Sequence, residues 1–171
     1  SRLGAGSRFV RWTGTLTRLQ RMPFSSYLIG RVNAQLTPDR LVSAEQFQVG
    51  GSFSVRGYRE GRLVGDSGLT ASIEGHWPMY LIPKSWKLPF LNVPLRENIE
   101  IIGFTDFGAS YTNFPPDGQE ASDYLFSVGT GIRIRLTKLL TLRVDIGWPL
   151  LKAPPDTSRP RIHFGLQNQL F

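Results

Sequence analysis

Three arginines stand in a glycine-rich segment whose length sets it apart from an ordinary turn. The segment GGSFSVRGYREGRLVGDSG, residues 50–68, carries Arg56, Arg59 and Arg62. A hairpin loop normally takes about two to five residues. An arginine guanidinium stays charged and can bind a carboxylate through two parallel hydrogen bonds, so it suits a paired site. The segment is therefore either an ordinary surface loop or a functional part of the protein.

The sequence GDSG also invites a catalytic interpretation, with Ser67 as the nucleophile of a serine protease. The chain has only two histidines, His76 and His163, and neither has an evident aspartate partner in the sequence. It has no cysteine and no closely spaced pair of histidines, so no metal site is indicated. We expect no catalytic residue, metal or cofactor, and interpret Asp66 and Gly68 as part of a turn at the end of the segment.

Charge and hydropathy exclude other classes of protein. The net charge is +7, and sixteen of the twenty basic residues are arginine. They are scattered along the chain, often at alternate positions, rather than clustered as in a nucleic-acid patch, so we expect no nucleic-acid partner. No run of eighteen apolar residues indicates a transmembrane helix. The first residues lack the apolar centre of a signal peptide, so if the protein is exported we expect its signal to lie upstream.

Apolar and polar residues alternate with a period of two almost throughout the chain. In YLFSVGTGIRIRLT, residues 124–137, one face is largely apolar and the other carries glycine, serine and arginine. This alternation predicts β-strands, with no helix. The seven predicted strands lie near residues 8–20, 28–36, 69–77, 99–107, 124–137, 140–150 and 161–171.

The length of these strands favours a membrane protein. Strands of soluble proteins usually have about 5–6 residues, whereas about ten are needed to cross a bilayer at a tilt. We therefore predict an all-β, transmembrane antiparallel β-barrel with its apolar face against outer-membrane lipid. Arg133, Arg135, Arg143 and Asp145 would face the lumen, as structural charges or as contacts for a passing substrate. A soluble β-sandwich or adhesin is the alternative from another class.

The predicted strand number is odd, whereas bacterial single-chain barrels have an even number. Unpaired strand edges are unfavourable in lipid because their backbone groups find no water there. We therefore expect residues 1–171 to form part of one larger barrel domain, with seven or eight of its strands.

A series of short motifs runs from residue 45 to the end of the chain. In order, they are FQVGG (47–51), SVRGY (54–58), GDSG (65–68), a strand with Glu74, GFTDFG (103–108), VGTGIRIRL and LTLRVDIGWPL. Together they resemble the outer-membrane transporters of two-partner secretion, of the haemolysin-activator type. The V-R-G-Y/F loop is shared with a wider superfamily of outer-membrane insertases and translocases.

The resemblance implies a barrel of about sixteen strands preceded by periplasmic POTRA domains. This chain would be the C-terminal half of that barrel and would contain no POTRA domain. The implied function is a non-enzymatic channel that exports an unfolded partner exoprotein to the cell surface without ATP. An insertase for other barrels, or a passive porin, are the alternatives.

The resemblance also assigns roles to individual residues. The long loop, about residues 38–67, would fold back into the barrel, where Arg56 of Val55-Arg56-Gly57-Tyr58 would pair with Asp106 on the wall. Gly57 would permit a sharp backbone turn, and Tyr58 would pack against the wall. The supporting motif residues are Phe104, Gly108, Gly65, Asp66, Gly68 and Glu74.

The last residue, Phe171, is typical of the signal that outer-membrane barrels present to their assembly machinery. It shares strand parity with Gln167 and His163 rather than with Phe164 and Leu166. We expect either a bulge that shifts the phase or a degenerate signal.

Overall fold

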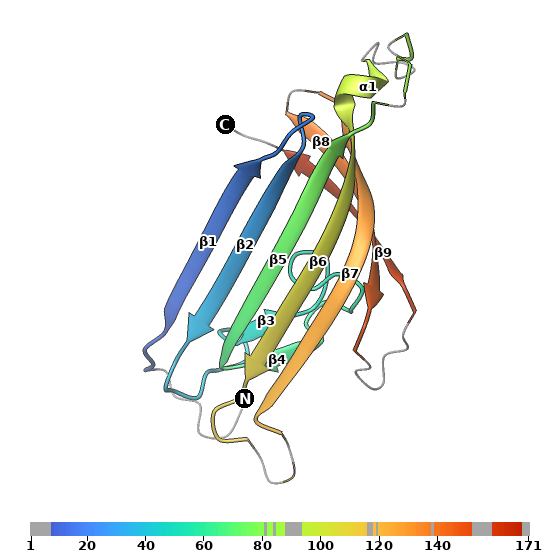
Figure 1. The fold of residues 1–171 in the computed structure, drawn as a ribbon. Coiled ribbons are helices and arrows are strands. Elements are labelled where there is room, and N and C mark those ends of the chain that lie inside the picture. The colour runs from blue at the N-terminus through green and yellow to red at the C-terminus, as the bar shows by residue number, and fades with distance from the viewer. Residues whose placement is uncertain are drawn as a thin grey trace.

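The computed structural model describes residues 8–80, 82–83, 85–87, 94–115, 118, 120–137, 139–151 and 159–168. Within these residues one antiparallel sheet of seven strands dominates, in the order β1-β2-β5-β6-β7-β8-β9 (Figure 1). The strands are β1 (Trp12–Arg21), β2 (Tyr27–Leu36), β5 (Ser67–Pro78), β6 (Ile99–Tyr111), β7 (Ser122–Arg135), β8 (Leu140–Pro149) and β9 (Arg161–Asn168). The predicted all-β antiparallel architecture is confirmed, and so are the seven long strands.

The central strands are long enough to cross a bilayer. β5, β6 and β7 have 12, 13 and 14 residues, and β6 is paired with β7 along its whole length. A one-turn helix, α1 (Leu95–Asn98), precedes β6, so the prediction of no helix is wrong at these four residues. In the described part of the chain, no helix is long and apolar enough to cross a membrane.

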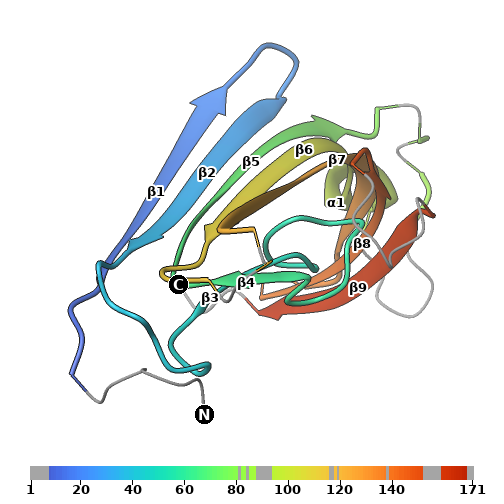
Figure 2. The ribbon, with the colours of Figure 1, turned by 90° about the horizontal axis from the view of Figure 1, so that it is seen from below.

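The two faces of the sheet differ as the alternation predicts. One face exposes large apolar side chains, among them Leu16, Val32, Leu69, Ile73, Trp77, Ile101, Val128, Ile132, Trp148, Ile162, Phe164 and Leu166. The opposite face carries buried polar and charged groups, including His76, Asp106, Arg133 and Asp145. The sheet is curved, and the long segment between β2 and β5 lies on its concave side (Figure 2). The polar face is therefore the one that encloses this segment.

The segment between β2 and β5 has structure of its own, which the sequence did not predict. Two short strands, β3 (Phe47–Val49) and β4 (Leu63–Gly65), pair antiparallel within it. We call residues 37–66 the inner loop. A small apolar core joins this loop to β7 and consists of Val49, Val55, Tyr58, Leu63 and Leu125, with Phe47 packed against it. Burial of these side chains holds the loop against the sheet by the hydrophobic effect.

Candidate functional site: the anchored inner loop

The backbone around Arg56 is folded into tight turns that depend on glycine. Gly50, Gly51 and Gly57 have φ angles of 111°, 100° and 95°, a region that side chains with a Cβ rarely adopt. The amide of Gly50 donates to Ser54 Oγ over 2.7 Å, and that of Gly51 donates to the Val55 carbonyl over 3.1 Å. These turns bring Val55, Arg56, Gly57 and Tyr58 to the wall of the sheet, where all four are buried.

Arg56 of the inner loop forms a bidentate ion pair with Asp106 of β6. Its Nε donates to Asp106 Oδ2 and its Nη2 donates to Asp106 Oδ1, both over 2.7 Å. The backbone amide of Arg56 also donates to Asp106 Oδ2, over 3.1 Å. The two side chains are 3% and 0% exposed. This is the strongest geometry available to a guanidinium and a carboxylate, and water does not screen it.

Two further carboxylates and an aromatic ring surround the same guanidinium. Arg56 Nη1 donates to Glu74 of β5 and lies 3.4 Å from Asp145 Oδ2 of β8. The Phe104 ring of β6 lies beneath it, with 3.5 Å between the guanidinium carbon and the ring centroid. Burial alone would lower the pKa of Arg56, but the hydrogen bonds and charge of Asp106 and the charge of Glu74 raise the pKa above its ordinary value. One loop residue thereby contacts side chains of three strands.

Asp145 joins Arg56 to two arginines of the wall. Arg133 Nη1 donates to its Oδ1 and Arg143 Nε donates to its Oδ2, both over 2.5 Å. Arg143 Nη2 also donates to the carbonyl of Ser52 in the inner loop, over 2.8 Å. The acids of this cluster, Glu74, Asp106 and Asp145, thus match the three guanidinium groups of Arg56, Arg133 and Arg143 in number. Such balance is what makes buried charges tolerable.

Gly57 and Tyr58 attach the loop to the strands nearer the C-terminus. The Gly57 amide donates to His163 Nε2 of β9 over 3.2 Å. The Tyr58 hydroxyl lies 2.9 Å from the carbonyl oxygens of Phe126 and Leu151, and it accepts a hydrogen bond from the Leu151 amide over 3.1 Å. The loop tip is thus attached to β5, β6, β8 and β9 by polar contacts, and to β7 through Phe126.

Asp66 does more than form part of a turn, because it binds two backbone amides at the base of the inner loop. It is fully buried. Its Oδ1 accepts from the Leu41 amide over 2.9 Å, and its Oδ2 accepts from the Asn113 amide beyond β6 over 2.7 Å. The neighbouring glycines permit close packing: a Cβ on Gly65 would stand 2.6 Å from the Tyr111 carbonyl oxygen, and one on Gly108 would stand 2.7 Å from a Val55 methyl.

Comparison with known proteins assigns the family. Residues 6–169 match the family model described as the Omp85 superfamily domain. The chain belongs to the Omp85 superfamily.

Individual relatives of this Omp85 domain agree with that assignment. The chain is 28% identical over 144 residues to the outer membrane transporter CdiB of Dickeya dadantii (strain 3937), and the match covers 84% of this chain and 23% of that protein. The structure of CdiB from Acinetobacter baumannii matches with a TM-score of 0.68 and 21% identity, covering 95% of this chain and 27% of that one. CdiB from Escherichia coli matches with a TM-score of 0.69 and 17% identity, covering 96% and 28%.

These matches settle the fold and the location. The Omp85 domain spans about a quarter of the length of the relatives it matches. It is a transmembrane β-barrel portion located in the outer membrane, which rules out the soluble β-sandwich alternative.

Arg135, Ser67 and Phe171 are three further residues that the sequence singles out. Arg135 faces the same side as Arg133, but its side chain is 50% exposed and its Nη2 lies 3.7 Å from Glu100. Ser67 Oγ accepts from the Thr37 amide over 3.1 Å and donates to the Thr37 carbonyl over 3.3 Å. Phe171 lies outside the described residues, and its role as an assembly signal stays a prediction.

Several residues of the site were not anticipated in these roles. Ser72 donates to Asp106 Oδ1 over 2.6 Å, His163 receives the Gly57 amide, and Asp145 links Arg56 to the arginines of the wall. A signal for Ser72 existed in the sequence, because it shares strand parity with Glu74 and His76. The contact of His163 with Gly57 spans 106 positions of the sequence, and that of Asp145 with Arg56 spans 89. The alternation within one strand does not predict pairing over such separations.

Proposed function

We propose that this chain is the C-terminal part of an outer-membrane channel that exports an unfolded partner protein from the periplasm to the cell surface. The complete barrel would supply strands beyond the two edges of the described sheet, β1 and β9. Transport would draw no energy from ATP, and the channel would perform no covalent chemistry. The partners would be one secreted exoprotein, outer-membrane lipid and, during biogenesis, the barrel-assembly machinery.

The observation that carries this proposal is the attachment of the inner loop to the concave, polar face through Arg56. A loop held by a buried ion pair inside a barrel occupies space that a passive pore would leave open to solutes. The polar wall beside it offers hydrogen-bond partners and charges to an extended polypeptide, whose own backbone groups must be satisfied. We propose that the pair of Arg56 and Asp106 holds the loop in the conformation that transport requires.

An insertase of the same superfamily is the second candidate, because it would share the inner loop. Secretion is favoured because the relatives named above are the outer membrane transporter CdiB of Dickeya dadantii and two further CdiB proteins. A passive porin would need no anchored loop. The residues that precede this chain in the complete protein distinguish these possibilities further, since two POTRA domains there would support the transporter.

The experiment is a secretion assay in cells that express the complete protein. Arg56→Ala and Asp106→Ala should each abolish release of the exoprotein, while the barrel still inserts and shows heat-modifiable migration. Arg59→Ala is the matched control, because it removes the same charge from an exposed position on the same loop and should leave secretion intact. Normal secretion in both single variants of the ion pair would contradict the proposal.

A further inference from the structure

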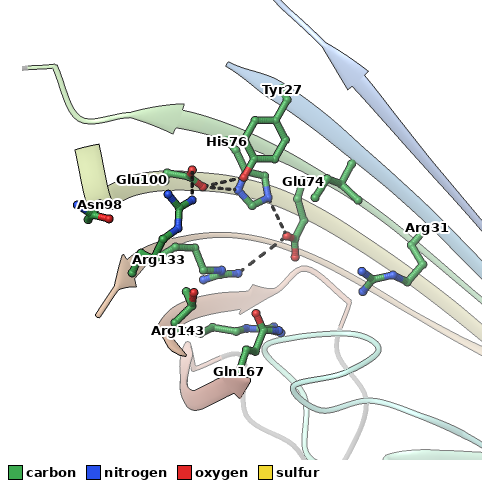
Figure 3. Close-up of a pocket in the computed structure, with 12 residues that line it drawn as sticks. Tyr27, Arg31, Glu74, His76, Asn98, Glu100, Arg133, Arg143 and Gln167 are labelled. Carbon is green, nitrogen blue, oxygen red and sulfur yellow. Dashed lines mark hydrogen bonds and ion pairs between the residues drawn. The ribbon is translucent and has the colours of Figure 1, made fainter. Parts of the chain in front are cut away.

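His76 of β5 lies between two carboxylates on the polar face of the sheet. The side chain is buried, with the residue 5% exposed. Its Nδ1 lies 3.1 Å from Glu100 Oε2, and its Nε2 lies 3.2 Å from Glu74 Oε2. The Tyr27 ring stacks on the imidazole at 4.4 Å between centroids, and the Tyr27 hydroxyl donates to the same Glu100 oxygen over 2.8 Å. Figure 3 shows the imidazole bridging Glu74 and Glu100 beside Tyr27.

The chemistry of these contacts specifies the protonation state of His76. An ionised carboxylate only accepts hydrogen bonds, and a neutral imidazole has a single N–H to donate. Both contacts can be hydrogen bonds only when both ring nitrogens carry a proton. The geometry therefore fits an imidazolium cation with one carboxylate on each side.

Glu74 connects this imidazole to the loop anchor. One of its oxygens faces His76 and the other accepts from Arg56 Nη1. A carboxylate held by two cations in this way has little freedom to rotate away from either of them. We propose that His76 is a positioning residue of the inner loop, which as an imidazolium holds Glu74 against Arg56 and releases it when the ring loses a proton.

Other charged groups surround His76. Arg133 and Arg135 of β7 lie 3.9 Å from Glu74 and 3.7 Å from Glu100, respectively. Arg31 of β2 and Arg143 of β8 line the same cavity, which has a volume of about 470 Å³. Among arginine, glutamate, tyrosine and histidine, only the imidazole has an ordinary pKa between pH 5 and 8. Raising the pH through this range therefore removes one cation and leaves the imidazole with a single N–H for its two contacts with Glu74 and Glu100.

His163 also contacts the inner loop, and we expect its contact to depend on pH in the opposite direction. Its Nε2 accepts a hydrogen bond from the Gly57 amide, which requires that nitrogen to be unprotonated. Acid should therefore weaken the contact at His163, whereas alkali should weaken the contact at His76. The loop is expected to be held most firmly at an intermediate pH. In a plot of loop release against pH, the rise at low pH (the acid limb) belongs to His163, and the rise at high pH (the alkaline limb) belongs to His76.

The test measures loop attachment in the complete protein, purified in detergent, with single cysteines in an otherwise cysteine-free background. Val55→Cys replaces a fully buried loop residue and reacts with a maleimide only when the loop leaves the wall. Phe53→Cys, at a position 84% exposed on the same loop, reports the reactivity of an unprotected thiol at each pH. The ratio of the two rates should rise several-fold between about pH 6.5 and pH 9. A flat ratio over that range would overturn the proposal.

Three variants separate positioning from a merely structural role. His76→Gln should raise the ratio at every pH and remove the alkaline limb. Glu100→Gln removes the negative charge of one partner of the imidazolium and should move that limb to lower pH. His163→Gln, whose amide oxygen can still accept from Gly57, should keep the alkaline limb and lose only the acid limb. An unchanged alkaline limb in His76→Gln, or an unmoved one in Glu100→Gln, would contradict the assignment.

The effect on transport rests on the proposed function, but loop attachment does not. If Arg56→Ala secretes normally while His76→Gln loosens the loop, the proposed function fails and the role of His76 stands. If Arg56→Ala abolishes secretion while His76→Gln leaves the ratio and its pH profile unchanged, the role of His76 fails and the proposed function stands.

Discussion

The backbone of Gly57 in the inner loop lies directly against Gly147 of β8. A Cβ built on Gly147 would stand 2.6 Å from the Gly57 nitrogen and 2.7 Å from the Arg56 carbonyl carbon. Both obstacles are backbone atoms, so no side-chain rotation can relieve them. The loop therefore sits at a depth that only a glycine on the wall permits.

Gly147→Ala should push the inner loop away from the wall. The added methyl group cannot fit unless the segment of Arg56 and Gly57 moves, which lengthens the contact with Asp106. We expect the alkylation rate of Val55→Cys to rise several-fold. Gly165→Ala on β9 is the matched control, since a Cβ there meets nothing within 4 Å. Equal rates in the two alanine variants would contradict this account of the close approach.

Tyr58→Phe should reduce stability without changing the shape of the loop. The variant loses the hydroxyl that bonds to the backbone of Phe126 and Leu151. The Phe126 carbonyl keeps the Leu150 amide as a donor, but the part-buried Leu151 amide and carbonyl lose their bonds to the tyrosine. The cost should be about 1–3 kcal/mol. It should appear as a lower temperature for the loss of heat-resistant migration of the complete barrel. Tyr124→Phe, on the exposed apolar face of β7, should show no shift; equal losses in both variants would rule out a specific role for the Tyr58 hydroxyl.

Asp66→Asn should open the base of the inner loop. Both carboxylate oxygens of Asp66 accept backbone amides, from Leu41 and Asn113, so the NH₂ group of asparagine must face one N–H donor. The loss of a charged acceptor in a buried site should cost about 1–3 kcal/mol, and proteolysis within the loop should become up to about a hundredfold faster. Asp123→Asn, an exposed aspartate that accepts from its neighbour Tyr124, is the control. Unchanged cleavage in Asp66→Asn would be the contrary result.

Much of the fold followed from the alternation of residues, because a curved sheet with one apolar and one polar face imposes a period of two. Where the alternation failed at Phe104, the inner loop is the cause. Ile102 and Phe104 blur the pattern of β6 because they are apolar residues on the polar face, buried at 0% and 6% exposure. Phe104 is there to pack beneath the Arg56 guanidinium. A pattern that assumes a wet lumen cannot anticipate a residue that the loop covers.

The site was only partly predictable for a related reason. The motifs pointed to Arg56 and Asp106, but they did not show that Glu74 and Asp145 contact the same guanidinium. Those contacts depend on strand register and on the depth of the loop, which single-strand patterns do not specify. The short strands β3 and β4 were missed because three residues are too few to show a period.

The apolar face of β7 should tolerate no charge. Val128 lies near the middle of the strand with its side chain on the exposed apolar face. An arginine facing lipid at mid-depth costs about 2–4 kcal/mol, so Val128→Arg should reduce the fraction of inserted, heat-modifiable barrel. Thr141→Arg introduces the same charge into the cavity on the polar face and should insert normally. Equal insertion of both variants would reverse the assignment of the two faces.

We propose that the ion pair of Arg56 and Asp106 holds the inner loop for transport. Asp106→Asn tests it most directly, because it removes the charge and keeps the size of a fully buried side chain. Loss of one partner of a buried pair costs about 3–5 kcal/mol. The exoprotein secreted per folded barrel should therefore fall to about a tenth or less of the unmodified amount. Secretion at the unmodified level, with the barrel fully inserted, would contradict the account.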